Sequence, residues 1–232
     1  MQLTIAGLLR VSRGPVARGK LALDMALYQQ RKKDGESMAT TEYLLECEVE
    51  RVLSAMMPVN ALVMRVMLHT GLRVGDVLAL RFPLRVQMWI TEKKTGKRRH
   101  IGLTQQLIDE IGRRAEYYYP PQLRQYINAA PPRGVAPLWA FPSPRDYEKH
   151  RTRQAIWKDV KRAARAFRLQ ANAGTHSMRK VYAVDLMRKY GDFGRVRRAL
   201  NHSDDSVTAV YAMADRLLEA RLERKRKRST DR

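Results

Sequence analysis

Apolar residues recur at helical spacing in the segment that begins near residue 41. In TEYLLECEVERVLSAM they are Leu44, Leu45, Val49, Val52, Leu53 and Met56, and Thr40 or Thr41 is the expected N-cap. Pro58 interrupts this pattern. The following segment, NALVMRVMLHTG, is strongly apolar, which is typical of a buried helix, and Gly71 is expected to end it. Two consecutive helices, the second one buried, therefore open the predicted domain.

The pattern changes to a period of two over residues 86–91, where apolar and more polar positions alternate in VQMWIT. Gly96 then marks a turn into RRHIGL. Together these features predict a β-hairpin. Its expected tip carries Lys93, Lys94 and Lys97.

Helical spacing returns after the hairpin. We expect one helix over residues 104–118, and then a long irregular connection in the Pro-rich segment YPPQLRQYINAAPPRGVAP. A basic helix is expected over 147–168, with Arg151, Arg153, Lys158, Lys161 and Arg162 among its cations. Further helices are expected over residues 176–190, 193–200 and 205 to about 224.

These elements predict an α+β fold that is mainly α, a helical bundle with one small antiparallel sheet. The domain is expected to cover residues 41–215. Residues 1–40 are expected to form a short basic extension, and residues 216–232 a basic C-terminal helix or tail. The tail could extend the preceding helix and dock on another protein chain, or it could be a solvated basic tail that contacts a polyanion nonspecifically, and the sequence favours neither.

The net charge narrows the class of partner. The chain has 45 Lys and Arg against 23 Asp and Glu, which gives a net charge of +22 and favours a polyanionic partner. Nucleic acid is the leading candidate, although a ribosomal protein or a membrane-surface protein could carry the same charge. Cys47 is the only cysteine, which excludes an intrachain disulfide and a Cys-based zinc site. Because no apolar segment approaches the length of a membrane span, we expect a cytoplasmic protein with no membrane partner.

Several short motifs could hold a phosphate, and each also has an ordinary structural interpretation. His176 and Arg179 lie three apart in GTHSMRK, in the expected first turn of a helix, where the helix dipole and a guanidinium favour an anion. A capped surface helix is the alternative. Arg73 lies in the joint TGLR with Asp76 three residues later, and an ion pair between these two side chains would equally explain the motif.

Two further motifs offer chemistry of their own. Lys94 at the hairpin tip could donate a proton to a leaving oxygen, although lysines are common in solvated turns. His202 precedes an expected helix that carries Tyr211 about two turns in. A tyrosine between apolar neighbours at helical spacing is more often a packing residue than a nucleophile.

The order and spacing of these motifs are more specific than any one of them. A TGLR arginine, a KTG lysine, an H-x-x-R pair, a histidine 23 residues after that arginine and a tyrosine nine residues later follow one another in the chain. In the order and spacing of these motifs, the chain resembles the tyrosine recombinase, or phage integrase, family. The resemblance covers residues 41–215, including LECEVERVLSAM at the start and PLWAFPS before the basic helix.

The resemblance implies six catalytic residues: Arg73 and Arg179 grip the scissile phosphate, His176 and His202 assist, Lys94 protonates the leaving 5′ oxygen, and Tyr211 attacks. Asp76 would hold these side chains in position without contacting the phosphate itself. The implied reaction cuts and rejoins DNA through a 3′-phosphotyrosyl bond, without ATP, metal or cofactor. The sequence contains no acidic cluster suited to magnesium, which agrees with a metal-free mechanism.

The resemblance also implies the partners. These are double-stranded DNA at recombination sites and a homotetramer assembled on that DNA, from a chain that is a monomer in solution, with accessory DNA-bending proteins. DNA contacts are expected from Arg151, Arg153, Lys158, Lys161 and Arg162 of the basic helix and from Lys93 and Lys97 of the hairpin. Such a protein would be associated with the nucleoid.

The chain departs from the family pattern in places. Asn201 stands where glycine is usual, Met178 where leucine is common, and Asp76 where glutamate is more frequent. The short connection before the hairpin leaves open which of Lys93, Lys94 or Lys97 is the general acid. About 40 residues precede the expected domain, too few for the family's core-binding domain, so the chain resembles compact members such as the fimbrial inversion recombinases.

Two other functions remain compatible with the sequence. The first is a non-catalytic DNA-binding protein on the same fold, acting in transposition or regulation. The second is a type IB topoisomerase, which uses similar chemistry but usually needs a larger clamp around one duplex. The complete set of six residues favours the recombinase.

Overall fold

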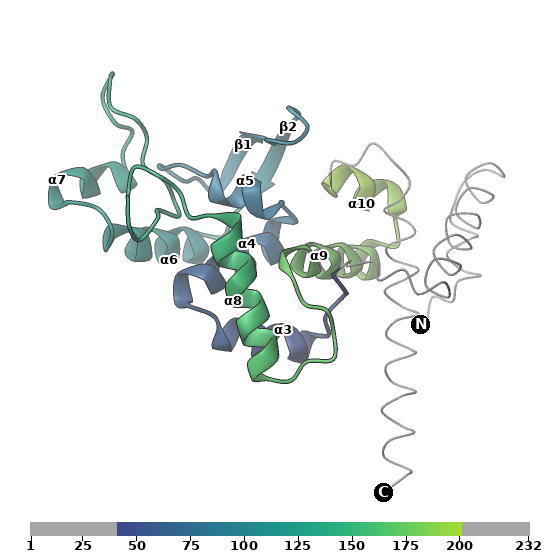
Figure 1. Ribbon diagram of the computed structural model, residues 1–232. Coiled ribbons are helices and arrows are strands. Elements are labelled where there is room, and N and C mark those ends of the chain that lie inside the picture. The colour runs from purple at the N-terminus through teal and green to yellow at the C-terminus, as the bar shows by residue number, and fades with distance from the viewer. Residues whose placement is uncertain (1–40, 201–232) are drawn as a thin grey trace, which may run out of the picture.

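The computed structural model describes residues 41–200, and it consists of helices with one two-stranded sheet (Figure 1). The helices are α3 (Glu46–Ala55), α4 (Pro58–Thr70), α5 (Val74–Leu78), α6 (Gln105–Glu116), α7 (Pro121–Arg124), the 3₁₀-helix η1 (Gln125–Ile127), α8 (Arg153–Ala166), α9 (Thr175–Tyr190) and α10 (Phe193–Leu200). The strands are β1 (Gln87–Thr91) and β2 (Arg98–Gly102). The predicted mainly helical fold with a small antiparallel sheet is confirmed.

Helix α4 is the centre of the core and packs against α3, α5, α6 and α9. It is buried on almost every side, as its apolar sequence predicts. Pro58 occupies the first helical position, where a missing N–H costs nothing. Gly71 ends the helix with a φ of 65°, and a Cβ atom there would collide with the Tyr182 ring. Only glycine meets both conditions, so the joint leading to Arg73 has a fixed path.

Helix α3 begins later than predicted. Thr41 does not cap it, because residues 41–45 are not helical and the first helical residue is Glu46. The Glu42 backbone N–H donates to the Asn172 carbonyl (2.9 Å), which ties this segment to the loop before α9. The Glu48 side chain accepts a hydrogen bond from the Leu45 N–H (2.9 Å) and so satisfies the donor at the true helix start.

The predicted hairpin is confirmed, with Trp89 opposite His100 and Ile90 opposite Arg99 in an antiparallel register. The period of two places Trp89 and His100 on the exposed face. Arg99 and Ile101 are buried on the other face. Residues 92–97 form the turn, and all three predicted lysines lie in it.

Two predictions between the hairpin and α9 are wrong in part. The Pro-rich connection is not irregular throughout, because it contains α7 and η1. The basic helix begins at Arg153, not at residue 147, because the Thr152 hydroxyl accepts from the Ala155 N–H (3.1 Å) and caps it there. The preceding loop is instead closed by a bridge between Pro142 and His150.

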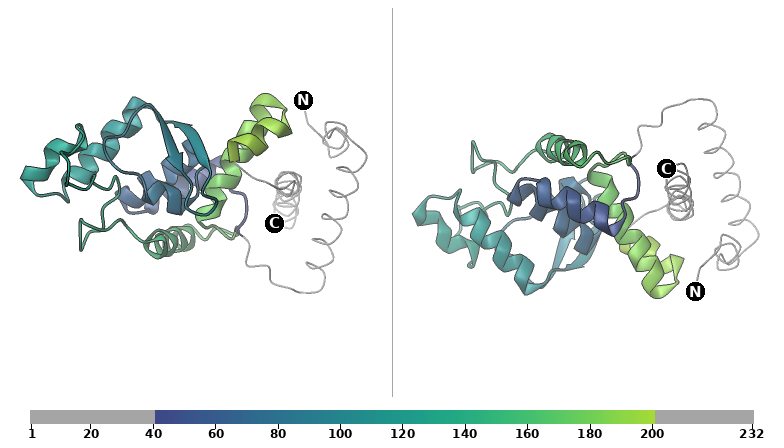
Figure 2. Two further views of the ribbon diagram at one scale, coloured as in Figure 1. Left: turned by 90° about the horizontal axis from the view of Figure 1, so that it is seen from above. Right: turned by 90° about the horizontal axis from the view of Figure 1, so that it is seen from below.

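Helices α7 and α10 lie at opposite ends of the described structure in space, and α8 runs along one side of it (Figures 1 and 2). The hairpin lies beside α5, on the side of the N-terminal end of α9 (Figure 1). This arrangement brings together the α4–α5 joint, the hairpin turn and the first turn of α9. Within residues 41–200, none of the helices is long and apolar enough to cross a membrane.

Candidate phosphate-binding site

Arg73 lies directly before α5, in the joint that Gly71 opens. Its Nη1 donates to Glu92 Oε2 at 2.8 Å, and the Arg73 side chain is 17% exposed. The interpretation of Arg73 and Asp76 as an ion pair that orders the turn is therefore wrong. The partner of Arg73 is a carboxylate from the hairpin, 19 residues away in sequence.

Asp76 instead holds the hairpin turn. Its Oδ1 accepts a hydrogen bond from the Lys93 backbone N–H at 2.9 Å, and the residue is buried. Its Oδ2 is buried and has no hydrogen-bond partner among the described residues. Asp76 thus lies behind the candidate site and fixes the turn that carries the lysines.

Glu92 is a site residue that the sequence did not reveal. Its carboxylate is fully buried and contacts Arg73 on one oxygen and Arg99 on the other (3.5 Å). Burial by itself raises the pKa of Glu92, but hydrogen bonds from Thr95 and Arg73, with the charges of Arg73 and Arg99, lower it overall. The carboxylate is therefore ionised at neutral pH and compensates two buried guanidinium groups.

Arg179 joins three parts of the chain. It lies in the first turns of α9 and is 5% exposed. Its Nη1 donates to the Gly71 carbonyl (2.5 Å) and its Nη2 to the Leu200 carbonyl (2.6 Å). Burial lowers the pKa of Arg179 to about 10, with further lowering by the charges of Arg73 and Arg99. Burial and neighbouring positive charges thus both disfavour the charged form of Arg179.

His176 lies one turn before Arg179, at the N-terminus of α9. Desolvation lowers the pKa of His176, and the charges of Arg179, Lys180, Arg73 and Lys94 lower it further. The imidazole is therefore protonated less readily than that of an ordinary histidine. Arg73, Lys94 and Arg179, from three separate segments, thus all lie within electrostatic range of His176.

The three hairpin lysines differ in their surroundings. The Lys93 ammonium lies 3.4 Å from His150 Nε2. His150 Nδ1 lies 2.6 Å from the Arg151 carbonyl and so donates to it, which leaves Nε2 as the acceptor for Lys93. Lys94 is the hairpin lysine whose charge acts on His176. This contrast favours Lys94 over Lys93 as the lysine that faces the site.

His202 and Tyr211 lie outside the described residues. The last described residue, Leu200 at the end of α10, does contact the candidate site, because its carbonyl accepts a hydrogen bond from Arg179. The roles expected for His202 and Tyr211 remain predictions from the sequence.

The candidate site combines several cations with few anions. Arg73, Arg99 and Arg179 influence one another's charge, and the carboxylates that act on Arg179 are Glu92 and Asp76. Because planar guanidinium donors match phosphate oxygens, a group of arginines with few carboxylates is a candidate site for an anion. Across residues 41–200, no three His, Cys, Asp or Glu side chains cluster in a way that could hold a metal ion.

The basic helix presents fewer surface cations than predicted. Arg151 is a correction: it precedes α8, is 3% exposed, and donates to Asn60 Oδ1 (3.3 Å) and to the Tyr118 hydroxyl (2.8 Å). Its buried guanidinium cannot face DNA without leaving these partners. Arg162 pairs with Asp159 at 2.6 Å, which reduces its free charge.

Two predicted cations of α8, Arg153 and Lys158, are exposed, and Lys161 is half-buried with a bond to Asn172. Trp157, which the sequence reasoning missed, is 49% exposed between them, with the Lys161 ammonium 5.9 Å from its ring centroid. Large exposed aromatic side chains on a basic helix are typical of a binding surface. The signal was present in the sequence as a tryptophan beside Lys158.

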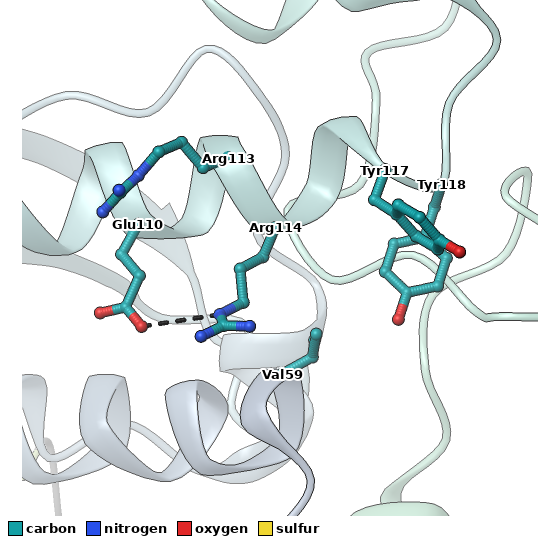
Figure 3. A pocket seen from close by; sticks show the side chains of 6 residues that line it. All are labelled: Val59, Glu110, Arg113, Arg114, Tyr117 and Tyr118. Carbon is teal, nitrogen blue, oxygen red and sulfur yellow. Dashed lines mark ion pairs between the residues drawn. The ribbon is translucent and has the colours of Figure 1, made fainter.

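A separate pocket of about 380 Å³ lies where α6 ends against the start of α4 (Figure 3). It is lined by Val59, Glu110, Arg113, Arg114, Tyr117 and Tyr118. Glu110 in its wall forms ion pairs with both Arg65 (2.8 Å) and Arg114 (3.6 Å). None of the predicted catalytic residues lines this pocket.

Comparison with known proteins relates the whole described domain to one family. The sequence matches the profile of the Phage integrase family over residues 42–216. It is 29% identical over 160 residues to the "Probable integrase/recombinase YoeC" of Bacillus subtilis, covering 64% of this chain and 74% of that protein. It is 27% identical over 153 residues to the tyrosine recombinase XerD of Lacticaseibacillus casei, covering 64% of this chain and 48% of XerD. The chain thus spans about half the length of that relative and three quarters of the first.

Solved structures share the fold at low identity. The XerH site-specific recombinase bound to palindromic difH substrate superposes with a TM-score of 0.55 at 21% identity, over 78% of this chain and 52% of XerH. A λ integrase dimer bound to a COC′ core site gives a TM-score of 0.57 at 15% identity, over 91% of this chain and 65% of the integrase. The predicted recombinase fold is confirmed. On the sequence match over residues 42–216, the protein belongs to the phage integrase family of tyrosine recombinases.

Proposed function

We propose that this protein is a site-specific DNA recombinase that cuts and rejoins DNA through a 3′-phosphotyrosyl intermediate. The proposal is supported by one observation: the charges of Arg73, Lys94 and Arg179, which come from three segments, all act on His176. A scissile phosphate would bring a negative charge to these cations. Donors fixed in advance then stabilise the additional charge that develops on its oxygens during the reaction.

The proposed first step breaks one phosphodiester bond and forms another. The Tyr211 oxygen attacks phosphorus, and the bond from phosphorus to the 5′ oxygen breaks. The Tyr211 proton passes to a neutral imidazole, for which His176 is the described candidate because its pKa is lowered. The leaving 5′ oxygen takes a proton from Lys94. Attack by a 5′ hydroxyl from another strand reverses these steps, so rejoining needs no ATP.

The partners of the proposed reaction are two DNA duplexes and further copies of this chain. Strand exchange requires two duplexes to be cut together, and a homotetramer provides one nucleophile for each of the four strands. The XerH and λ integrase neighbours were solved with DNA, which supports DNA as the substrate. Accessory DNA-bending proteins belong to the same proposal.

A covalent capture experiment on DNA of random sequence tests the function and finds the target site at the same time. The protein is incubated with a library of nicked duplexes, the mixture is denatured, and protein-linked DNA is recovered and sequenced. We expect wild type to enrich a shared sequence, and Tyr211→Phe to recover none. Recovery of no linked DNA by wild type, together with tight binding of DNA, would instead support a non-catalytic DNA-binding protein.

DNA affinity is expected to depend steeply on salt, and α8 is expected to contribute. Each phosphate neutralised adds about −0.9 to the slope of log affinity against log salt. We therefore expect Lys158→Ala to make the slope shallower by about one such unit. Trp157→Ala is expected to weaken binding by about 5–10-fold without changing the slope, because its ring carries no charge.

Fluorescence titrations at several salt concentrations measure both effects. Lys149→Ala is the matched control, since Lys149 is exposed but paired with Asp146 in the loop before α8. A slope near zero for wild type, or an unchanged slope for Lys158→Ala, would contradict the assignment of α8 as a phosphate-contacting surface.

A further inference from the structure

We infer that Glu92 is a positioning residue. Its carboxylate fixes the Arg73 guanidinium relative to the turn that carries Lys94, so that both side chains can contact the same phosphate at once. The two contacts, one with Arg73 and one with the turn, are called the lock below. This inference rests on the proposed function. It concerns how the site is assembled and adds Glu92 to the residues that the reaction requires.

The first half of the lock is the contact with Arg73. Glu92 Oε2 accepts from Arg73 Nη1 at 2.8 Å, and the carboxylate is fully buried. Arg73 has five N–H groups in a planar fork, so this contact uses one branch and fixes the plane of the rest. Its remaining donors have no partner among the described residues that would prevent a contact with phosphate.

The second half of the lock is the turn itself. The Glu92 N–H donates to the Lys97 carbonyl (3.0 Å), and the Glu92 carbonyl accepts from the Gly96 N–H (2.9 Å). The same Oε2 that binds Arg73 also accepts from the Thr95 hydroxyl at 3.0 Å. Both ends of the turn are therefore attached to Glu92, and Lys94 lies between them.

The negative charge of Glu92 is needed as well as its shape. Oε1 faces Arg99, which is 8% exposed and also donates to the Thr70 carbonyl. Without the carboxylate, Arg73 and Arg99 would be left with like charges in a poorly solvated region near Arg179. Like charges that are buried without a counter-charge repel, so the two guanidinium groups would move apart. A glutamine at position 92 would also turn an NH₂ group toward one of the arginines, and this donor cannot accept a hydrogen bond from a guanidinium.

Two modified substrates separate the two halves of the lock. A methylphosphonate at the scissile position carries no negative charge, so it reduces the need for Arg73. A 5′-bridging phosphorothiolate leaves as a thiolate that needs no proton, so it reduces the need for Lys94. Both are made on the sequence recovered by covalent capture, and cleavage rates are measured under single-turnover conditions for wild type and Glu92→Gln.

On ordinary DNA we expect Glu92→Gln to slow cleavage by about 30-fold or more, with DNA binding changed by less than about threefold. On each modified substrate, the difference between wild type and variant is expected to shrink by at least about threefold. Glu110→Gln is the matched control, since Glu110 also pairs with two arginines but lies in the wall of the distant pocket. It is expected to leave cleavage unchanged.

Other outcomes overturn the inference. Cleavage by Glu92→Gln at the wild-type rate, or faster, means that the carboxylate is dispensable or restrains Arg73. A difference that shrinks on one substrate only, or on neither, removes the link between the two groups. If Glu92→Gln is unfolded at the assay temperature, Glu92→Asp, which keeps the charge but shortens the reach, undergoes the same comparison. Absence of cleavage by wild type would overturn the proposed function itself.

Discussion

Replacing Arg179 with lysine is expected to reduce covalent cleavage of DNA by about 10²–10³-fold. Arg179 uses its planar guanidinium to bind the carbonyls of Gly71 and Leu200 at once, and the proposed phosphate contact comes in addition. A lysine carries the same charge but has a single ammonium group. It cannot hold both carbonyls and present a fork to the phosphate. The loss should therefore fall on the rate of cleavage more than on the affinity for DNA.

Single-turnover cleavage and equilibrium DNA binding, measured on the same variant, separate these two effects. Arg188→Lys serves as the matched control, because Arg188 lies on the same helix and is exposed. Circular dichroism establishes that both variants are folded. Cleavage by Arg179→Lys within about threefold of wild type would show that its fork is not needed for the reaction.

Lys94→Ala is expected to slow cleavage by about 10²–10⁴-fold, the range typical for loss of a general acid. On DNA with a 5′-bridging sulfur at the scissile bond, the same variant is expected to recover most of the wild-type rate. The reason is that a thiolate leaves without protonation, so the proton of Lys94 is no longer required. Rates on the two substrates are compared for each variant under identical conditions.

Lys93→Ala and Lys97→Ala provide the matched controls from the same turn. The Lys93 ammonium lies near His150, so its removal is expected to change the rate on ordinary DNA by less than about fivefold, with no recovery on the sulfur substrate. Recovery seen with Lys93→Ala or Lys97→Ala, and not with Lys94→Ala, would assign the general acid to that lysine instead.

The sequence predicted those parts of the fold that depend on local pattern. The alternation over residues 86–91 indicated the hairpin, and the apolar segment ending at Gly71 indicated α4, because side-chain burial repeats with the period of each element. The start of α8 was missed because basic residues continue on both sides of Arg153. Only the Thr152 cap marks where the helix begins.

The site was predictable as a set of residues but not as a network of contacts. The motif order pointed to Arg73, Lys94, His176 and Arg179, and in the structure the charges of the three cations act on His176. The buried pairing of Arg73 with Glu92 could not be foreseen, because it depends on how the hairpin packs on α5. Arg151 was misassigned for a similar reason: its burial comes from contacts with Asn60 and Tyr118, far away in the chain.

The central claim is that a DNA phosphate becomes bonded to Tyr211, and mass spectrometry of the linked product tests it directly. Covalently captured protein is digested with nuclease and trypsin, and the peptide that carries a nucleotide is sequenced. We expect the added mass on Tyr211, linked through the 3′ phosphate, and absent from Tyr211→Phe. A nucleotide on another residue, or linked through a 5′ phosphate, would contradict the account.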